Sequence, residues 1–149
     1  MKKPILCLDF DGVIHSYTSK WVDEATICDP PVKGALRWMW KATEWFDVQI
    51  YSSRSKIPAG IQAMKDWLHV FATHEWGDPD FSDQFVAAFD FPTQKPAAFL
   101  AIDDRALTFE GNWSEWDPAD LLNFKPWNKR EPNAFELGAA VRKLGLVGK

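Results

Sequence analysis

Short apolar runs alternate with longer helical patterns along this chain. Continuous or alternating apolar runs are typical of strands in a parallel sheet, and apolar residues three or four apart are typical of amphipathic helices. The pattern predicts strands at Ile5–Phe10, Asp47–Ser52, Phe85–Phe89 and Ala98–Ile102, and helices at Val32–Phe46, Pro58–Phe71 and Ala134–Leu144. Since strands and helices alternate, we expect an α/β fold, namely a three-layer, Rossmann-like parallel sheet flanked by helices.

The stretches between these elements show no clear period. Residues 13–29 predict a long loop or a small hairpin, and residues 76–83 predict a solvated acidic loop. The pattern predicts no element for residues 105–131. The sequence contains no internal repeat and no obvious linker, and its 149 residues suit one hydrophobic core. A single domain over residues 1–149 is therefore expected.

Composition narrows the class of protein. Hydrophobic residues make up 46% and charged residues 26% of the chain, which argues against wholesale disorder. The net charge of −4 gives no support to a generic electrostatic nucleic-acid binder. The apolar runs are too short for a transmembrane helix or a signal peptide, so we expect no membrane association. The two cysteines lack CxxC spacing, which favours a reducing, cytoplasmic setting without disulfides or zinc.

Acidic and hydroxyl residues stand where three of the predicted strands end. Asp9 and Asp11 follow the first strand, Ser52 ends the second, and Asp103 and Asp104 follow the last. Because the carboxyl ends of parallel strands meet at one edge of a sheet, we expect these side chains to converge. Like charges in such a group destabilise one another unless cations are present. Hard oxygen ligands that leave room for a substrate phosphate suit Mg²⁺.

The same residues carry a resemblance to a known superfamily. The sequence contains, in order, Leu8-Asp9-Phe10-Asp11-Gly12-Val13, then Ile50-Tyr51-Ser52, then Lys95-Pro96, and finally Asp103-Asp104 after an apolar run. This ordered set resembles the four motifs of the haloacid dehalogenase (HAD) superfamily, chiefly its phosphatases. Neither long gap between the motifs leaves room for a large cap domain, so the resemblance is to a capless or minimally capped member.

The resemblance implies a role for each motif residue. Asp9 would attack the phosphate and form an aspartyl-phosphate, and Asp11 would protonate the leaving group and then activate water, in agreement with nucleophilic and acid–base chemistry. The resemblance assigns the phosphate site to Ser52, Lys95 and Gly12, and the Mg²⁺ site to Asp9, Asp11, Asp103 and Asp104, with the backbone carbonyl oxygen of Phe10. Within this set, Asp104 either binds the metal directly or supports the other ligands.

Several assignments have plainer alternatives. The stretch from Asp9 to Gly12 is also typical of an ordinary turn after a strand. Ser52 is also a candidate for a local cap, and Ser53 competes for its role. Lys56 competes with Lys95 as the phosphate-site lysine.

Three further side chains are candidates for contact with substrate, namely His15, Arg54 and Trp21. Arg54 is equally suited to pairing with an acid, and Trp21 is equally suited to packing on the body of the domain. Cys7 lies inside a buried strand, so we expect it to be a packed apolar residue rather than a reactive thiol.

The sequence therefore predicts a Mg²⁺-dependent phosphomonoester hydrolase that acts through an aspartyl-phosphate on a phosphorylated substrate of unknown class. One alternative is a nucleic-acid end phosphatase, which the acidic composition does not favour. Another is a catalytically silent interaction module with the same fold, against which the intact Asp9 and Asp11 argue. The sequence defines neither the substrate nor the oligomeric state.

Overall fold

The computed structural model describes residues 2–130 of the chain. The chain forms two compact units, Met1–Asp103 and Asp104–Lys149. The helix expected at Ala134–Leu144 lies outside the described residues. Among the residues that are described, no helix combines the length and the apolar character needed to cross a membrane.

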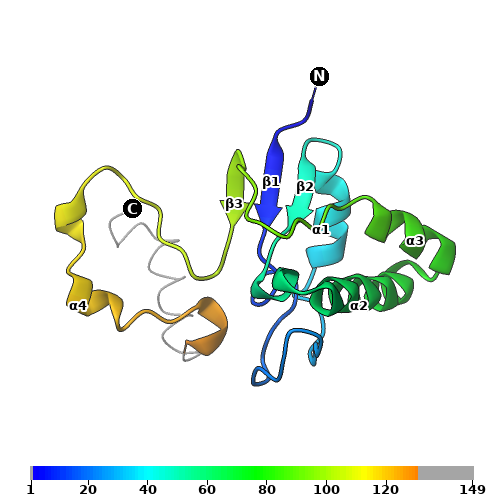
Figure 1. The fold of residues 1–149 in the computed structure, drawn as a ribbon, viewed down its shortest axis with the longest axis horizontal. Helices are drawn as coiled ribbons and strands as arrows, with labels where there is room; N and C mark the ends of the chain where they lie inside the picture. The colour runs from blue at the N-terminus through cyan, green and yellow to red at the C-terminus, as the bar shows by residue number, and fades with distance from the viewer. Residues whose placement is uncertain (1, 131–149) are drawn as a thin grey trace, which may run out of the picture. The chain divides into compact units, whose positions relative to one another are not determined.

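A parallel sheet forms the centre of the first unit (Figure 1). Its strands are β1 (Ile5–Leu8), β2 (Asp47–Ile50) and β3 (Leu100–Ile102), in the order β2-β1-β3. Leu8 pairs with Ile50 on one side and with Ile102 on the other, so the strands end at the same edge. After the central strand β1, the chain forms β2 on one side of it and later crosses over to form β3 on the other side. Ligands of open parallel sheets bind beyond the strand ends at such a reversal of direction.

Helices flank the sheet, as the pattern predicted. They are α1 (Ala35–Ala42), α2 (Pro58–Trp76) and α3 (Pro79–Ala87). α2 begins with a proline, whose fixed φ suits the first helical turn, and it ends at Gly77, whose φ of 68° is left-handed. α3 begins after Asp78, whose carboxylate accepts a hydrogen bond from the backbone N–H of Asp80.

Two predictions in the second crossover are wrong. Residues 76–83 are not one loop and Phe85–Phe89 is not a strand, because α3 occupies most of this stretch. Phe81 and Phe85 lie one helical turn apart, and both rings contact Trp76, at centroid distances of 4.9 and 5.2 Å. Helical spacing of these two rings lets both pack on the end of α2, which an extended strand would not allow.

The hydrophobic core joins the sheet to the helices. Leu6, Cys7 and Leu8 of β1 are all buried, which confirms the strand buried on both faces that the continuous apolar run predicted. In β2, by contrast, burial alternates. The core combines strand and strand-end residues with residues of all three helices of this unit, namely Leu6, Leu8, Phe10, Val48, Ile50, Leu36, Met39, Met64, Leu68 and Phe85.

The second unit contains short helical turns among exposed loops. The described turns are η2 (Trp113–Glu115), α4 (Pro118–Leu121) and η3 (Trp127–Lys129). Phe109, Trp113 and Trp116 form an aromatic cluster with ring centroids 4.6 to 5.7 Å apart. These rings account for part of the aromatic content of a stretch for which the pattern predicts no element.

Gly60, in the first turn of α2, packs against the backbone of Arg54. A Cβ atom at this position would lie 2.0 Å from the Arg54 carbonyl oxygen. We expect Gly60→Ala to lower the free energy of unfolding by about 1–3 kcal/mol, because backbone would have to move on one side of the contact. Chemical denaturation measures this loss, with Gln62→Ala on the exposed side of the same helix as control. Equal stability of the two variants would contradict the close approach.

Candidate active site

Three carboxylates gather where β1 and β3 end. The backbone N–H of Asp9 donates to the carbonyl oxygen of Ile102 at 3.0 Å, which extends the parallel ladder beyond the strands. This pairing sets Asp9 beside Asp103, and Asp104 is the next residue in the chain. Carboxylate oxygens of Asp9, Asp103 and Asp104 all lie within 4.8 Å of one another. Clustered hard oxygen donors of this kind fit a divalent cation such as Mg²⁺.

A small pocket opens beside this group. Its volume is about 200 Å³, and it is lined by Cys7, Asp9, Tyr51, Ser52, Ser53, Lys95, Ala101, Ile102 and Asp103. Residues from three distant parts of the sequence thus surround one space, as the strand-end argument predicted. The competing lysine, Lys56, is not among the lining residues, so Lys95 is the lysine beside the carboxylates.

Cys7 forms part of the pocket wall. Burial raises the pKa of its thiol above the ordinary value, the nearby positive charge of Lys95 opposes that rise, and the carboxylates of Asp9 and Asp103 add to it. The thiol therefore stays protonated near neutral pH and lacks the thiolate character of a reactive cysteine. This agrees with the expected packing role.

Asp11 stands outside the three-carboxylate group and has partners of its own. The Nε atom of Arg54 donates to both carboxylate oxygens of Asp11, at 3.1 and 3.0 Å. His15 Nε2 accepts the backbone N–H of Asp29 at 3.1 Å, so the ring proton is on Nδ1 and is donated to Asp11 Oδ1 at 2.8 Å. Both carboxylate oxygens of Asp11 thus accept hydrogen bonds from protein donors, and Asp11 is not part of the three-carboxylate group.

The chain turns sharply between Asp11 and His15. Gly12 has a φ of 85°, in the left-handed region where glycine is favoured, as the predicted turn required. The carbonyl oxygen of Phe10 accepts backbone N–H groups from Val13, Ile14 and His15, at 3.3, 2.9 and 2.9 Å. Since its lone pairs are used inside the turn, the expectation that this carbonyl binds metal is not supported.

Arg54 is the most deeply buried charged side chain among the described residues, with an exposed fraction of 1%. Besides pairing with Asp11, its Nη1 atom donates to the carbonyl oxygens of Asp23, Glu24 and Thr26, at 3.0, 2.9 and 3.0 Å. The sequence left two roles open for Arg54, contact with substrate and pairing with an acid. The structure shows the ion pair, with Asp11.

Ser52 is a local cap, as one of the two interpretations predicted, and it also lies at the pocket. Its hydroxyl oxygen accepts the backbone N–H of Arg54 at 3.0 Å, and its own backbone N–H donates to the hydroxyl of Ser55 at 3.1 Å, which caps the short helix η1 (Ser53–Lys56). Ser52 also lines the pocket, as does Ser53. The cap fixes the position of the Ser52 side chain at the pocket wall.

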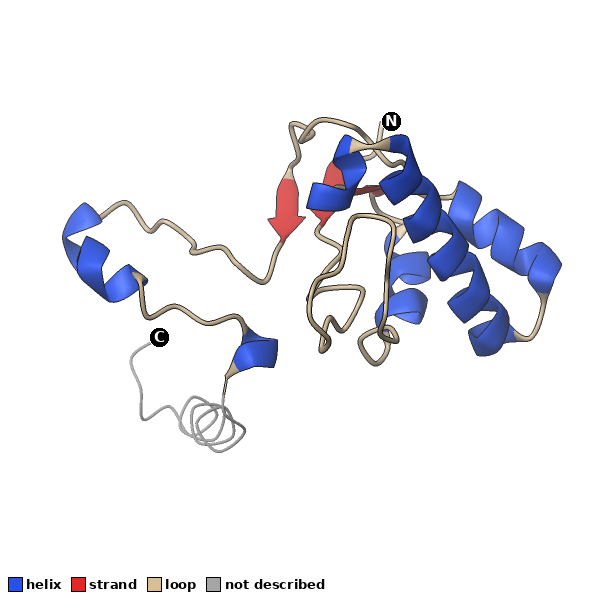
Figure 2. Cartoon of the chain, turned by 60° about the horizontal axis from the view of Figure 1, so that its bottom comes forward, coloured by secondary structure: helices blue, strands red, loops and turns tan. Residues whose placement is uncertain are grey.

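The segment of residues 13–29 is an irregular loop at the carboxyl ends of the strands, drawn in blue below the arrowheads in Figure 1 and without helix or strand in Figure 2. Asp29 anchors it, since its carboxylate accepts the backbone N–H and the hydroxyl of Ser19 at 2.8 and 2.6 Å. Burial acts to raise the pKa of Asp29, but hydrogen bonds from Ser19 and Thr18 together with the charge interaction with His15 outweigh it, so the pKa lies below its ordinary value. Trp67 donates from Nε1 to the Asp29 carbonyl oxygen at 3.0 Å.

The candidates for substrate contact differ in their accessibility. His15 and Arg54 each have an exposed fraction of 1%, and both contact Asp11. Trp21, in contrast, has an exposed fraction of 41%, and its ring lies over the guanidinium of Arg54, 4.5 Å from the guanidinium carbon to the ring centroid.

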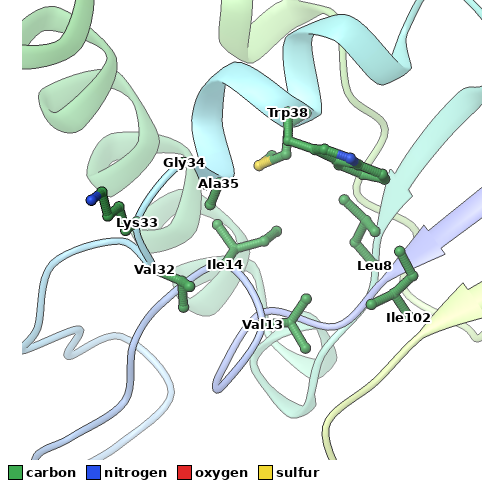
Figure 3. A pocket seen from close by; sticks show the side chains of 10 residues that line it. Leu8, Val13, Ile14, Val32, Lys33, Gly34, Ala35, Trp38 and Ile102 are labelled. Atoms are coloured by element: carbon green, nitrogen blue, oxygen red, sulfur yellow. The ribbon is translucent and has the colours of Figure 1, made fainter. Parts of the chain in front are cut away.

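A separate apolar cavity of about 430 Å³ lies beside α1 (Figure 3). Trp38 of α1 covers one side of it, with Leu8 and Ile102 of the sheet and Ile14 around the opening. Among its lining residues Lys33 alone is charged, and none is an acid or a nucleophile. The cavity therefore offers a surface for apolar groups but no groups for hydrolytic chemistry.

Comparison with models of protein families, with curated protein sequences and with solved structures finds no match to this chain.

Three contributors to the site were not singled out from the sequence. They are Asp29 and Trp67, which anchor the loop, and Tyr51, which lines the pocket. Tyr51 stands directly before Ser52, so its place at a strand end was a usable signal. No local pattern identifies Asp29 or Trp67, because their partners lie ten or more positions away in the sequence.

Arg54 forms its ion pair with Asp11 out of contact with solvent. In Arg54→Leu, Asp11 and three carbonyl oxygens would lose their donor. We therefore expect this substitution to lower the free energy of unfolding by about 3–5 kcal/mol. Arg37 pairs with Glu75 at the surface, so Arg37→Leu should cost less than about 1 kcal/mol. Urea denaturation compares the two variants. A loss for Arg54→Leu as small as that for Arg37→Leu would show that the buried pair contributes little.

Binding of Mg²⁺ to the three-carboxylate group should be visible as thermal stabilisation. At a Mg²⁺ concentration about tenfold above the dissociation constant, we expect the Tm of the wild-type protein to rise by roughly 3–6 °C. Asp103→Asn removes one charge from the group and should reduce the rise, whereas Glu44→Gln, at an exposed acid outside the group, should keep it. Differential scanning fluorimetry measures the shifts, and the same rise in all three proteins would argue against Asp103 as a ligand.

Proposed function

We propose that this protein is a Mg²⁺-dependent phosphomonoester hydrolase of the HAD type, with Asp9 as the nucleophile. The observation that carries the proposal is the convergence of Asp9, Ser52, Lys95 and Asp103, which are far apart in the sequence, around one pocket of about 200 Å³. A carboxylate nucleophile, a lysine charge and a hydroxyl donor around a small space match what a phosphate group requires.

The proposed reaction has two steps. In the first, a carboxylate oxygen of Asp9 attacks the phosphorus atom, the bond from phosphorus to the leaving oxygen breaks, and that oxygen takes a proton from Asp11. In the second, water attacks the phosphorus of the aspartyl-phosphate, gives a proton to Asp11 and releases inorganic phosphate, which regenerates the Asp9 carboxylate. For the first step Asp11 has to carry a proton. Arg54 and His15 orient Asp11 as a carboxylate that accepts hydrogen bonds, which is the form that takes the proton from water in the second step.

The remaining pocket residues stabilise charge. Lys95 is suited to neutralising the phosphoryl oxygens. The Ser52 oxygen already accepts the N–H of Arg54, so its own O–H is left to donate to a phosphoryl oxygen. Asp9, Asp103 and Asp104 would hold Mg²⁺, which supplies further positive charge against the phosphoryl group.

Neither alternative function has comparable support. A silent interaction module has no need for a nucleophile, a lysine and a group of carboxylates around one pocket. A nucleic-acid end phosphatase needs an extended basic surface, which the net charge of −4 does not favour.

We expect Asp9→Asn to abolish phosphatase turnover while the protein stays folded, because the amide keeps the size of the carboxylate and loses its nucleophilicity. Asp11→Asn should reduce kcat by about 10²–10⁴-fold, since proton transfer is lost. Release of inorganic phosphate from p-nitrophenyl phosphate and from a panel of monoesters, with Mg²⁺ and with EDTA, provides the measurement. Far-UV circular dichroism checks the fold, and Glu44→Gln serves as the control. Turnover by Asp9→Asn at the wild-type rate would overturn the covalent mechanism.

A further inference from the structure

Trp21 lies close to the carboxylate that transfers the proton in the proposed reaction. The ring centroid of Trp21 is 4.5 Å from the guanidinium carbon of Arg54, and Nε of the same guanidinium is 3.0 Å from Asp11 Oδ2. With the length of one C–N bond between them, the Trp21 ring lies within about 9 Å of the Asp11 carboxylate. A leaving group whose oxygen meets Asp11 is therefore within reach of the indole if it extends toward Trp21.

The indole is partly open to solvent. The guanidinium of Arg54 lies over the ring, yet 41% of the residue is exposed. The cation–π contact holds the ring against a buried charge. Trp45 is more exposed, at 65%, but it lies two residues before the amino end of β2, at the opposite edge of the sheet from the pocket. Exposure alone therefore does not distinguish Trp21, whereas its position does.

The loop that carries Trp21 is anchored on both sides of the ring. On the N-terminal side, Ser19 donates two hydrogen bonds to Asp29. On the C-terminal side, Arg54 binds the carbonyl oxygens of residues 23, 24 and 26. Tyr17 adopts a left-handed φ of 53°, a conformation that a non-glycine residue keeps only where its surroundings impose it. An aromatic side chain on a loop fixed in this way loses little conformational entropy when a ligand stacks on it.

We infer that Trp21 forms a stacking subsite for the leaving group, and that the site prefers small phosphomonoesters whose leaving group carries a planar ring, such as aryl phosphates and nucleoside monophosphates. The inference rests on the proposed function, because it concerns the leaving group of the same reaction. Stacking between a ring and an exposed indole is tolerant of ring identity, so the subsite selects flat leaving groups as a class.

Two phosphonates that cannot be hydrolysed test the subsite directly. Benzylphosphonate and methylphosphonate share the charged group and a carbon atom in the place of the ester oxygen, and they differ by one phenyl ring, so the ratio of their dissociation constants isolates the contribution of the ring. Isothermal titration calorimetry in Mg²⁺ should give the wild-type protein about tenfold higher affinity for benzylphosphonate. Trp21→Leu keeps apolar volume without a ring and should remove this preference while leaving methylphosphonate affinity unchanged, and Trp21→Phe should retain most of it.

Trp45→Leu is the matched control, because it removes an exposed indole at the other edge of the sheet and should leave the preference intact. Turnover supplies the second readout: kcat/KM for adenosine 5′-monophosphate should fall about tenfold in Trp21→Leu, and kcat/KM for glycerol phosphate should not. Equal binding of both phosphonates by a wild-type protein that hydrolyses monoesters would overturn the stacking subsite alone. A wild-type protein that binds neither phosphonate and hydrolyses no monoester would overturn the proposed function together with it.

A loss of affinity for both phosphonates in Trp21→Leu, accompanied by a lower Tm, would also overturn the subsite. In that case the indole would serve to keep Arg54 and its loop in place rather than to meet a leaving group.

Discussion

The guanidinium of Arg54 is buried, so its N–H groups need hydrogen-bond acceptors within the protein. The segments that supply these acceptors form part of the candidate site. An unpaired charge at this depth would cost several kcal/mol. The guanidinium donates to Asp11 and to the carbonyl oxygens of residues 23, 24 and 26, and the backbone N–H of Arg54 donates to the hydroxyl of Ser52. One side chain thus joins the turn after β1, the long loop over the strand ends and the cap after β2. Movement of any of these parts would leave buried polar groups without partners.

Charge separates the site into two regions that share the end of β1. Asp9, Asp103 and Asp104 form a group whose mutual repulsion favours a bound cation, with Lys95 at the same pocket. Asp11, only two residues from Asp9, has instead its own cation in Arg54 and a neutral histidine donor. The division agrees with the proposed chemistry. Asp9 would bond to phosphorus beside the metal, and Asp11 would transfer the proton outside the metal site.

The aromatic residues of this chain serve different purposes according to where the fold leaves them. Trp67 is buried and uses its Nε1 to hold the loop, and Trp76 packs between α2 and α3. Trp38 borders an apolar cavity that contains no groups for hydrolysis. Trp21 combines exposure, a contact with the buried guanidinium of Arg54 and nearness to Asp11, which is why its substitution is informative about the leaving group.

The sequence by itself determined the parallel α/β sheet and the convergence of Asp9, Ser52 and Asp103 near one edge, because strand ends follow from local apolar runs and parallel strands end together. Tertiary structure decided what each polar residue contacts. Local pattern did not choose between helix and strand for Phe85–Phe89, since a short apolar run fits either element, and the packing of Phe81 and Phe85 on Trp76 decides for the helix. Nor could it pair Arg54 with Asp11, because a salt bridge between residues 43 positions apart exists only once the strands between them are aligned.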